Sequence, residues 1–169
     1  MKILYLNNFG EPVADTHYEV LHRLFPNAEI TTVDNNYTET PIIDLIFDLE
    51  CIRDADYIVG VGYGGFLAYL AAIENNTKTL LVDPYIPMVD YLIGIPYMDE
   101  NRDNFKSLWE NNRGENKNCH ILLDATKQIP DLDKTFEEVK DISDVYIYCD
   151  SCSLPHSTKY ETWLKANIS

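Results

Sequence analysis

Short, almost continuously apolar segments recur along this chain, separated by longer amphipathic segments, and this alternation constrains the fold more than any other feature. Brief runs of Ile, Leu, Val and Tyr are typical of parallel strands that are covered on both faces. The segments between them carry apolar residues at helical spacing. An alternating order of strands and helices predicts an α/β fold, a three-layer α/β/α sandwich with a mostly parallel sheet and right-handed crossovers. The expected strands are Lys2–Leu6, Glu29–Val33, Tyr57–Val61, Thr79–Val82, His120–Leu123 and Val145–Tyr148. The expected helices lie near Thr16–Phe25, Thr40–Arg53, Gly65–Glu74, Phe105–Asn112, Thr135–Lys140 and Thr158–Ala166.

The whole chain, residues 1–169, is predicted to form a single domain. Its length is enough to bury one hydrophobic core. The least regular stretch, residues 83–104, contains three prolines and is expected to form a short helix and a loop at the carboxyl edge of the sheet. It is too short to separate two domains.

The charge balance excludes several classes of partner. The chain has 28 acidic and 13 basic residues, which gives a formal charge of −15. Nucleic-acid binding depends on Lys and Arg that neutralise phosphates, so we expect neither nucleic acid nor an anionic membrane surface as a partner. No apolar run approaches the roughly 20 residues of a membrane-spanning helix, and the first six residues resemble a buried strand rather than a signal peptide. A cytoplasmic location is therefore expected.

Cysteine and histidine spacing gives no metal or redox site. Cys149 and Cys152 form a C-x-x-C pair, but no helix pattern opens directly after it to favour a thiolate, and there is no second such pair to complete a zinc site. His17 and His22 are five residues apart on an expected helix, not the four of a helical metal pair, and are predicted to be surface groups. We therefore predict that the protein has no metal and no cofactor.

The most informative local feature is a glycine-rich turn at residues 57–65, where an apolar strand runs directly into a helix. Glycine permits positive φ in such a turn and lets the helix pack close to the strand. The free N–H groups at the start of the helix suit an anion, either a phosphate or a developing oxyanion.

One interpretation of this turn is a dinucleotide fingerprint. Gly60, Gly62 and Gly65 match G-x-G-x-x-G, and Asp83 ends the next strand where a ribose-binding acid would lie. The fingerprint normally opens the fold on its first strand, whereas here two strand–helix units precede it. A Rossmann-like enzyme that uses this turn is the alternative hypothesis.

The other interpretation is a nucleophile elbow without its nucleophile. In the pattern G-x-S-x-G the serine stands at the apex of a strand–turn–helix. Gly60 and Gly64 occupy the outer positions here, and Gly62 stands in place of the serine. At this point the chain resembles the small bacterial α/β-hydrolase esterases, a reduced form of that fold of about this length.

The resemblance extends along most of the chain. Leu6-Asn7-Asn8-Phe9-Gly10 is similar to the family's Leu-His-Gly-Phe-Gly turn after the first strand. Residues 25–34 resemble the entry to its second strand and the strand itself, and residues 82–87 resemble its Asn-Pro-Ala segment after the elbow helix. His156 lies before the last helix, where the family has its catalytic histidine.

Carried onto this sequence, the resemblance implies a damaged triad. Gly62 has no nucleophile, so acyl transfer by Ser-His-Asp chemistry is lost. The family's acid segment corresponds to residues 126–131, which puts Lys127 at the first acid position and Asp131 at the second. Asp131 fits an N-cap of the following helix better than a triad acid, and His156 is either the remaining catalytic base or a surface group.

The resemblance also implies a pocket above the turn. Asn7 and Asn8 replace the His-Gly of the oxyanion turn, which continues through Phe9 and Gly10. The backbone N–H groups of Phe9 and Tyr63, next to Gly64, are still expected to face this pocket. The function predicted is that of a catalytically degenerate hydrolase relative, a pseudoenzyme whose pocket binds a small molecule or a protein partner. A serine placed at position 62 is expected to fold with its hydroxyl facing the pocket.

Overall fold

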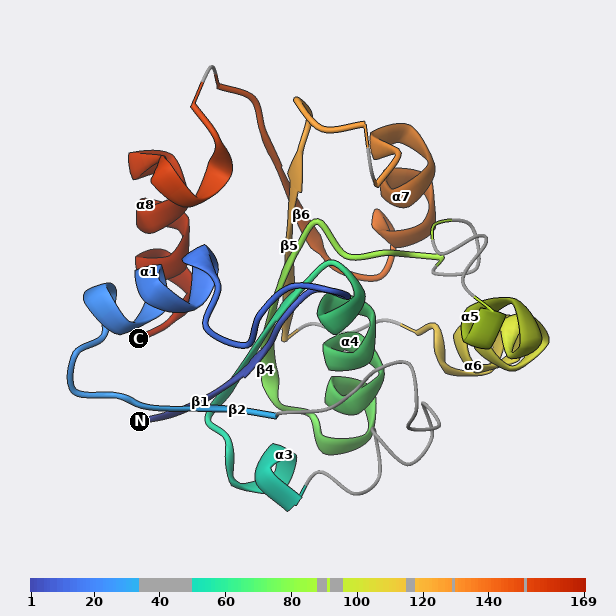
Figure 1. Ribbon diagram of the computed structural model, residues 1–169, viewed down its shortest axis with the longest axis horizontal. Coiled ribbons are helices and arrows are strands. Elements are labelled where there is room, and N and C mark those ends of the chain that lie inside the picture. The colour runs from blue at the N-terminus through green and yellow to red at the C-terminus, as the bar shows by residue number, and fades with distance from the viewer. Residues whose placement is uncertain (34–49, 88–90, 92–95, 115–117, 129, 151) are drawn as a thin grey trace.

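A six-stranded sheet forms the centre of the protein (Figure 1). The computed structural model describes all residues except 34–49, 88–90, 92–95, 115–117, 129 and 151. The strand order is β2-β1-β3-β4-β5-β6, and every neighbouring pair is parallel. The strands are β1 Lys2–Leu6, β2 Glu29–Thr32, β3 Tyr57–Val61, β4 Lys78–Val82, β5 Cys119–Asp124 and β6 Asp144–Tyr148.

Helices cover both faces of this sheet, so the predicted three-layer α/β fold is confirmed. In Figure 1, α1 and α8 lie on one side of the sheet, and α4, α6 and α7 lie on the other. The helical segments are α1 Thr16–Leu24, α3 Glu50–Asp54, α4 Tyr63–Asn75, α5 Pro96–Glu100, α6 Arg102–Asn112, α7 Leu132–Val139, the 3-10 helix η2 Leu154–His156 and α8 Thr158–Asn167.

Two separate apolar cores follow from the alternation of side chains along each strand. In β1, Ile3 and Tyr5 belong to the core under α1 and α8, whereas Leu4 and Leu6 belong to the core under α4. All four side chains are at most 2% exposed. Burial on both faces explains why this strand reads as a continuous apolar run rather than as an alternating one.

Helix ends differ from the expected positions where capping decides them. Helix α7 begins three residues before the expected start, because the Asp131 side chain accepts a hydrogen bond from the Lys134 N–H and caps the first turn. Helix α4 begins at Tyr63, directly after the turn at Gly62. Most of the helix expected at Thr40–Arg53 lies outside the described residues, and α3 is its described end.

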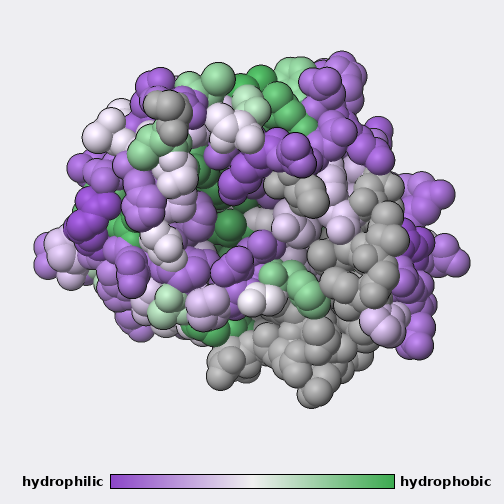
Figure 2. Space-filling model, turned by 45° about the horizontal axis from the view of Figure 1, so that its top comes forward, coloured by the Kyte–Doolittle hydropathy of each residue, from purple (hydrophilic) through white to green (hydrophobic). Residues whose placement is uncertain are grey.

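The strand order creates one switch point at the carboxyl edge of the sheet. From β1 the chain moves outward to β2, then returns to the other side of β1 and continues from β3 to β6. Ligands of open α/β sheets bind outside the carboxyl ends of the strands at such a point. The register pairs Leu6 of β1 with Gly60 of β3, so the segments that follow these two strands emerge side by side. In Figure 2, which turns this edge toward the viewer, a mostly hydrophilic surface surrounds a hollow with hydrophobic residues at its bottom.

Candidate functional site

Gly62 occupies the apex of a sharp turn between β3 and α4. Its φ of 54° and ψ of −116° lie outside the regions that residues with a Cβ usually adopt. The Gly62 N–H donates to the Val82 carbonyl oxygen at 3.0 Å, and the Gly62 carbonyl oxygen accepts from the Tyr85 N–H at 3.0 Å. Hydrogen bonds to neighbouring backbone therefore hold this conformation, which resembles the strand–turn–helix geometry of a nucleophile elbow and would be strained for a residue with a Cβ.

The other glycines of the turn are explained by close packing. A Cβ at Gly60 would lie 2.5 Å from the Gly64 carbonyl oxygen, and a Cβ at Gly65 would lie 2.9 Å from the Pro84 Cβ. Contacts this short force neighbouring atoms to move, so helix α4 packs too tightly on the sheet for side chains at these positions. The G-x-G-x-x-G match thus has a packing cause that does not involve a nucleotide.

Asn8 fills the space above Gly62. Its Oδ1 accepts a hydrogen bond from the Tyr63 N–H at 3.0 Å. A Cβ added to Gly62 would overlap Asn8 Oδ1 and would lie 2.5 Å from Asn8 Cγ. The Tyr63 N–H, which is expected to face the pocket, thus already has an acceptor in Asn8, and a serine at position 62 would have to displace the Asn8 side chain. The register of β1 against β3 brings the segment that carries Asn8 beside this turn.

The rest of the predicted oxyanion turn holds its own shape. Asn7 Nδ2 donates to the Glu11 carbonyl oxygen at 2.7 Å, and Gly10 has a φ of 75°. The Phe9 ring packs edge-on against the buried ring of Tyr63, with 6.1 Å between centroids. Gly64, which follows Tyr63 in α4, lies so close to the Leu6 backbone that no side chain fits there. Hydrogen bonds and close packing therefore hold this loop beside Gly62.

The two predicted triad remnants lie in different surroundings. Asp131 is exposed and caps α7, as described above, which matches the N-cap interpretation. His156 is exposed at the end of η2. It lies close enough to His17 for its charge to affect the pKa of His17. The structure thus places His156 near His17, whereas Asp131 caps the helix that it begins.

Lys127, at the first acid position, forms an ion pair with a buried carboxylate. Its Nζ lies 2.6 Å from Asp83 Oδ2, and the side chains are 40% and 4% exposed, respectively. Asp83 Oδ1 also accepts from the Asp124 N–H at 2.6 Å. Burial raises the pKa of Asp83, against the opposing effect of the Lys127 ammonium. The position to which the resemblance assigns the first acid therefore carries a positive charge.

His17 is buried, not a surface group as its spacing from His22 suggested. Its side chain lies on the inner face of α1 with Val20 and Leu21, and its Nδ1 is 3.0 Å from the Tyr160 hydroxyl. Burial, followed by the charges of Lys127 and His156, lowers the pKa of His17 to about 3. The apolar residues three and four positions further on are the sequence signal that would have identified this face.

Of the groups described above, Asn8, His17 and Lys127 line a pocket of about 220 Å³ at the switch point. It opens between the segments that follow β1, β3 and β5, which is where ligands of such sheets bind. A volume below the usual 300–1,000 Å³ of pockets for drug-sized molecules suits a small ligand. The lining residues are Asn8, Glu11, Asp15, Thr16, His17, Val61, Lys127 and Pro155.

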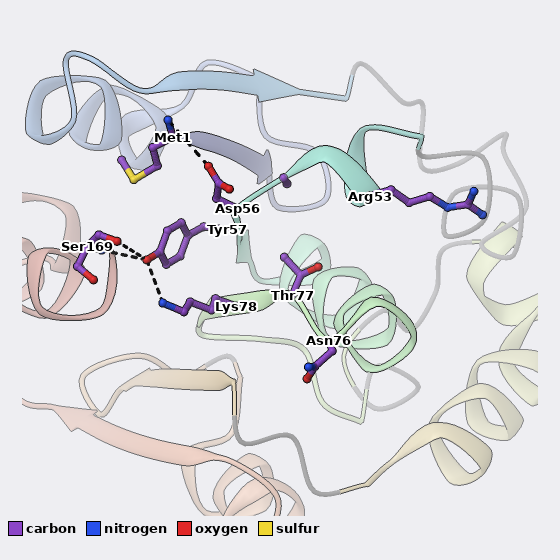
Figure 3. Close-up of a pocket in the computed structure, with 9 residues that line it drawn as sticks. Met1, Arg53, Asp56, Tyr57, Asn76, Thr77, Lys78 and Ser169 are labelled. Carbon is purple, nitrogen blue, oxygen red and sulfur yellow. Dashed lines mark hydrogen bonds and ion pairs between the residues drawn. The ribbon is translucent and has the colours of Figure 1, made fainter.

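A larger hollow, of about 710 Å³, lies at the opposite edge of the sheet (Figure 3). Its polar groups bond mainly to one another: the Tyr57 hydroxyl donates to the Ser169 carbonyl oxygen at 2.7 Å and accepts from Lys78 Nζ at 3.4 Å. Arg53 points away from this cluster in Figure 3. We prefer the smaller pocket as the functional site, because its polar groups converge at the carboxyl ends of the strands.

The described cysteines and metal-binding groups do not form a second site. Cys149 and Cys152 are free and exposed, and Cys119 is free and buried. Within the described ranges, no three His, Cys, Asp or Glu side chains group closely enough to hold a metal ion. No helix in the described part of the chain is long and apolar enough to cross a bilayer.

Comparison with known proteins identifies the fold. No family model matches the sequence, and no curated protein matches it. Solved structures do match: Est1E from Butyrivibrio proteoclasticus has a TM-score of 0.70 at 11% identity, over 98% of this chain and 84% of that one. The fold is that of the α/β-hydrolases.

Further hydrolase structures extend this likeness. MGS-MChE2, an alpha/beta hydrolase enzyme from a sediment metagenome of the Mar Chica lagoon, has a TM-score of 0.64 at 13% identity, over 98% of this chain and 91% of that one. The esterase domain of a Rhodothermus marinus protein has a TM-score of 0.62 at 12% identity, with 96% and 82% covered. These neighbours do not favour the dinucleotide-binding interpretation.

Proposed function

We propose that this protein binds a small molecule in the pocket beside the Gly62 turn, which Asn8 and Val61 line, and does not perform serine-dependent acyl transfer. Asn8 carries this proposal, because its side chain occupies the nucleophile's space and accepts the Tyr63 N–H at 3.0 Å. In an elbow, the N–H after the nucleophile stabilises the oxyanion. The turn of an elbow supplies the nucleophile and one oxyanion donor. Here the nucleophile is missing, and the donor is already bonded to Asn8.

The charge above the turn also supports binding without acyl transfer. A triad acid orients the catalytic histidine and stabilises its protonated form. Lys127 would oppose protonation of a nearby imidazole, and its ammonium is already paired with Asp83 at 2.6 Å. Asp131 accepts the Lys134 N–H instead. A pocket with these charges favours a polar ligand that remains chemically unchanged.

A fluorophosphonate probe, followed by intact-mass measurement, tests the proposal on the native protein. We expect no covalent adduct and no burst of product from p-nitrophenyl acetate. Weak turnover alone is not decisive, because a pocket with hydrogen-bond donors can accelerate hydrolysis without a nucleophile. An adduct on the folded protein would overturn the proposal. So would turnover that His156→Ala abolishes while His22→Ala, a matched change at an exposed histidine of α1, leaves it intact.

A further inference from the structure

His17 is the first of three hydrogen-bond donors that line the pocket. The Tyr160 hydroxyl is completely buried, and burial raises its pKa, so it keeps its proton. Its hydrogen-bond partner is His17 Nδ1. A buried hydroxyl needs an acceptor, so Tyr160 donates to Nδ1 and the neutral imidazole carries its hydrogen on Nε2. His17 is 8% exposed and lines the pocket, and no described residue bonds to Nε2. The ring therefore offers the pocket an N–H donor.

Two further donors belong to the same pocket. Of the residues that the structure describes, only Asp83 bonds to Lys127 Nζ, which leaves part of the ammonium's donor capacity for a ligand. Asn8 Nδ2 makes one long contact, 3.4 Å from the Tyr85 hydroxyl, because the Asn8 oxygen is the atom that faces Tyr63. The donors of His17, Lys127 and Asn8 suit a carboxylate, which accepts several hydrogen bonds at once.

The acidic residues of the lining argue against a plain anion. Glu11 is exposed and Asp15 is partly exposed, whereas His17 is buried, so the carboxylates stand nearer to solvent than the imidazole does. Asp15 is held in place by the Tyr5 hydroxyl at 2.6 Å and the Tyr18 N–H at 2.9 Å. With Asp83 already neutralising Lys127, these two carboxylates leave the pocket with a net negative charge.

We propose that the pocket binds a small zwitterion of the amino-acid class, with its carboxylate on the donors of His17, Lys127 and Asn8 and its ammonium beside Glu11 and Asp15. The carboxylate of such a molecule pairs with the donors of the lining, and its ammonium pairs with the carboxylates of the lining. A simple acid or a simple amine can pair with only one of these two sets. The pocket volume of about 220 Å³ suits a ligand of this size. This inference rests on the proposed binding function and names its ligand class.

The test uses the full chain and a panel of small probes. Glycine, L-alanine, β-alanine and γ-aminobutyrate vary the distance between the two charges. Propionate is alanine without its ammonium group, and ethylamine is alanine without its carboxylate. Binding is measured by ligand-observed NMR and by thermal shift at 10 mM of each probe. We expect at least one zwitterion to bind at least tenfold more tightly than propionate and at least tenfold more tightly than ethylamine.

Variants locate the binding. Lys127→Met combined with Asp83→Asn removes the ion pair without leaving a buried charge, and Glu11→Gln removes an exposed carboxylate. Both variants should weaken binding of the zwitterion at least tenfold, whereas Lys106→Met, at an exposed lysine of α6, should not. Glu11→Gln should leave the weak binding of propionate unchanged or improved.

Three outcomes overturn the inference: no zwitterion of the panel binds, propionate binds as tightly as the best zwitterion, or the pocket variants bind like the wild-type protein. The proposed function fails by a different measurement, a fluorophosphonate adduct, which these results do not affect. A protein that stays unlabelled and binds none of the probes therefore loses only the ligand class.

Discussion

Gly62→Ser is expected to destabilise the protein through two separate costs. The positive φ of residue 62 strains any residue with a Cβ, by about 1–3 kcal/mol. The new Cβ, 2.5 Å from Asn8 Cγ, also pushes the Asn8 side chain away from the Tyr63 N–H. Loss of that hydrogen bond adds about 0.5–1.5 kcal/mol. A total near 2–4 kcal/mol corresponds to a melting temperature roughly 5–15 °C lower in a protein of this size.

Two further variants separate these costs. Gly10 also has a positive φ, of 75°, but an added Cβ there has no atom within 4 Å, so Gly10→Ser reports strain without overlap. Asn8→Ala clears the space above the turn, so Gly62→Ser should cost about 1 kcal/mol less in that background than in the wild-type protein. Urea unfolding of the four proteins of the Asn8/Gly62 cycle, with Gly10→Ser as the control, gives both quantities. If Gly62→Ser costs the same with and without the Asn8 side chain, the Asn8 amide does not occupy the nucleophile's space.

Three other outcomes follow from the site. Lys127→Met leaves the buried carboxylate of Asp83 without its cation, and at pH 8 it should lower the free energy of unfolding by about 3 kcal/mol. Burial already raises the pKa of Asp83, and loss of Lys127 raises it further, which favours the protonated acid at low pH. The difference in unfolding free energy between the variant and the wild-type protein should therefore be smaller when urea unfolding is repeated at pH 5. Burial lowers the pKa of His17 to about 3 in the folded protein. Below about pH 6.5 the unfolded chain therefore binds a proton at His17 that the folded protein does not bind. For this reason the free energy of unfolding should fall as the pH drops from 6.5 toward 3. His17→Gln, which keeps an acceptor for Tyr160, should reduce that fall by roughly 2 kcal/mol between pH 6.5 and 5, and an unchanged pH profile would contradict the buried neutral imidazole. Isothermal titration with NAD or FAD should give no binding, since packing accounts for the glycine motif, and micromolar affinity for either would restore the dinucleotide-binding hypothesis.

Strand positions and the glycine turn were predictable because their causes are local. An apolar run marks a strand buried on both faces, and a strand followed by clustered glycines marks a tight turn into a helix. The turn at Gly62 was therefore placed correctly from residues 57–65 alone.

The chemistry above the turn depends on contacts between distant segments, which local patterns do not contain. Asn8 meets Tyr63 across 55 positions, and Lys127 meets Asp83 across 44. The resemblance supplied the right loops but not the direction of their side chains. His17 is an intermediate case, because the helical spacing of Val20 and Leu21 after it did indicate a buried face.

The contact between Asn8 and Gly62 limits the order in which this sequence can change. Any side chain at position 62 competes for the volume that the Asn8 amide fills, so the two positions are not free to vary independently. A serine becomes tolerable at position 62 only after the residue at position 8 has become smaller or has turned away. Likewise, an asparagine at position 8 can lie over the turn only when position 62 has no side chain. Substitutions at these two sites should therefore occur as pairs among related sequences, because a serine at position 62 beside Asn8 costs both backbone strain and the Asn8 hydrogen bond.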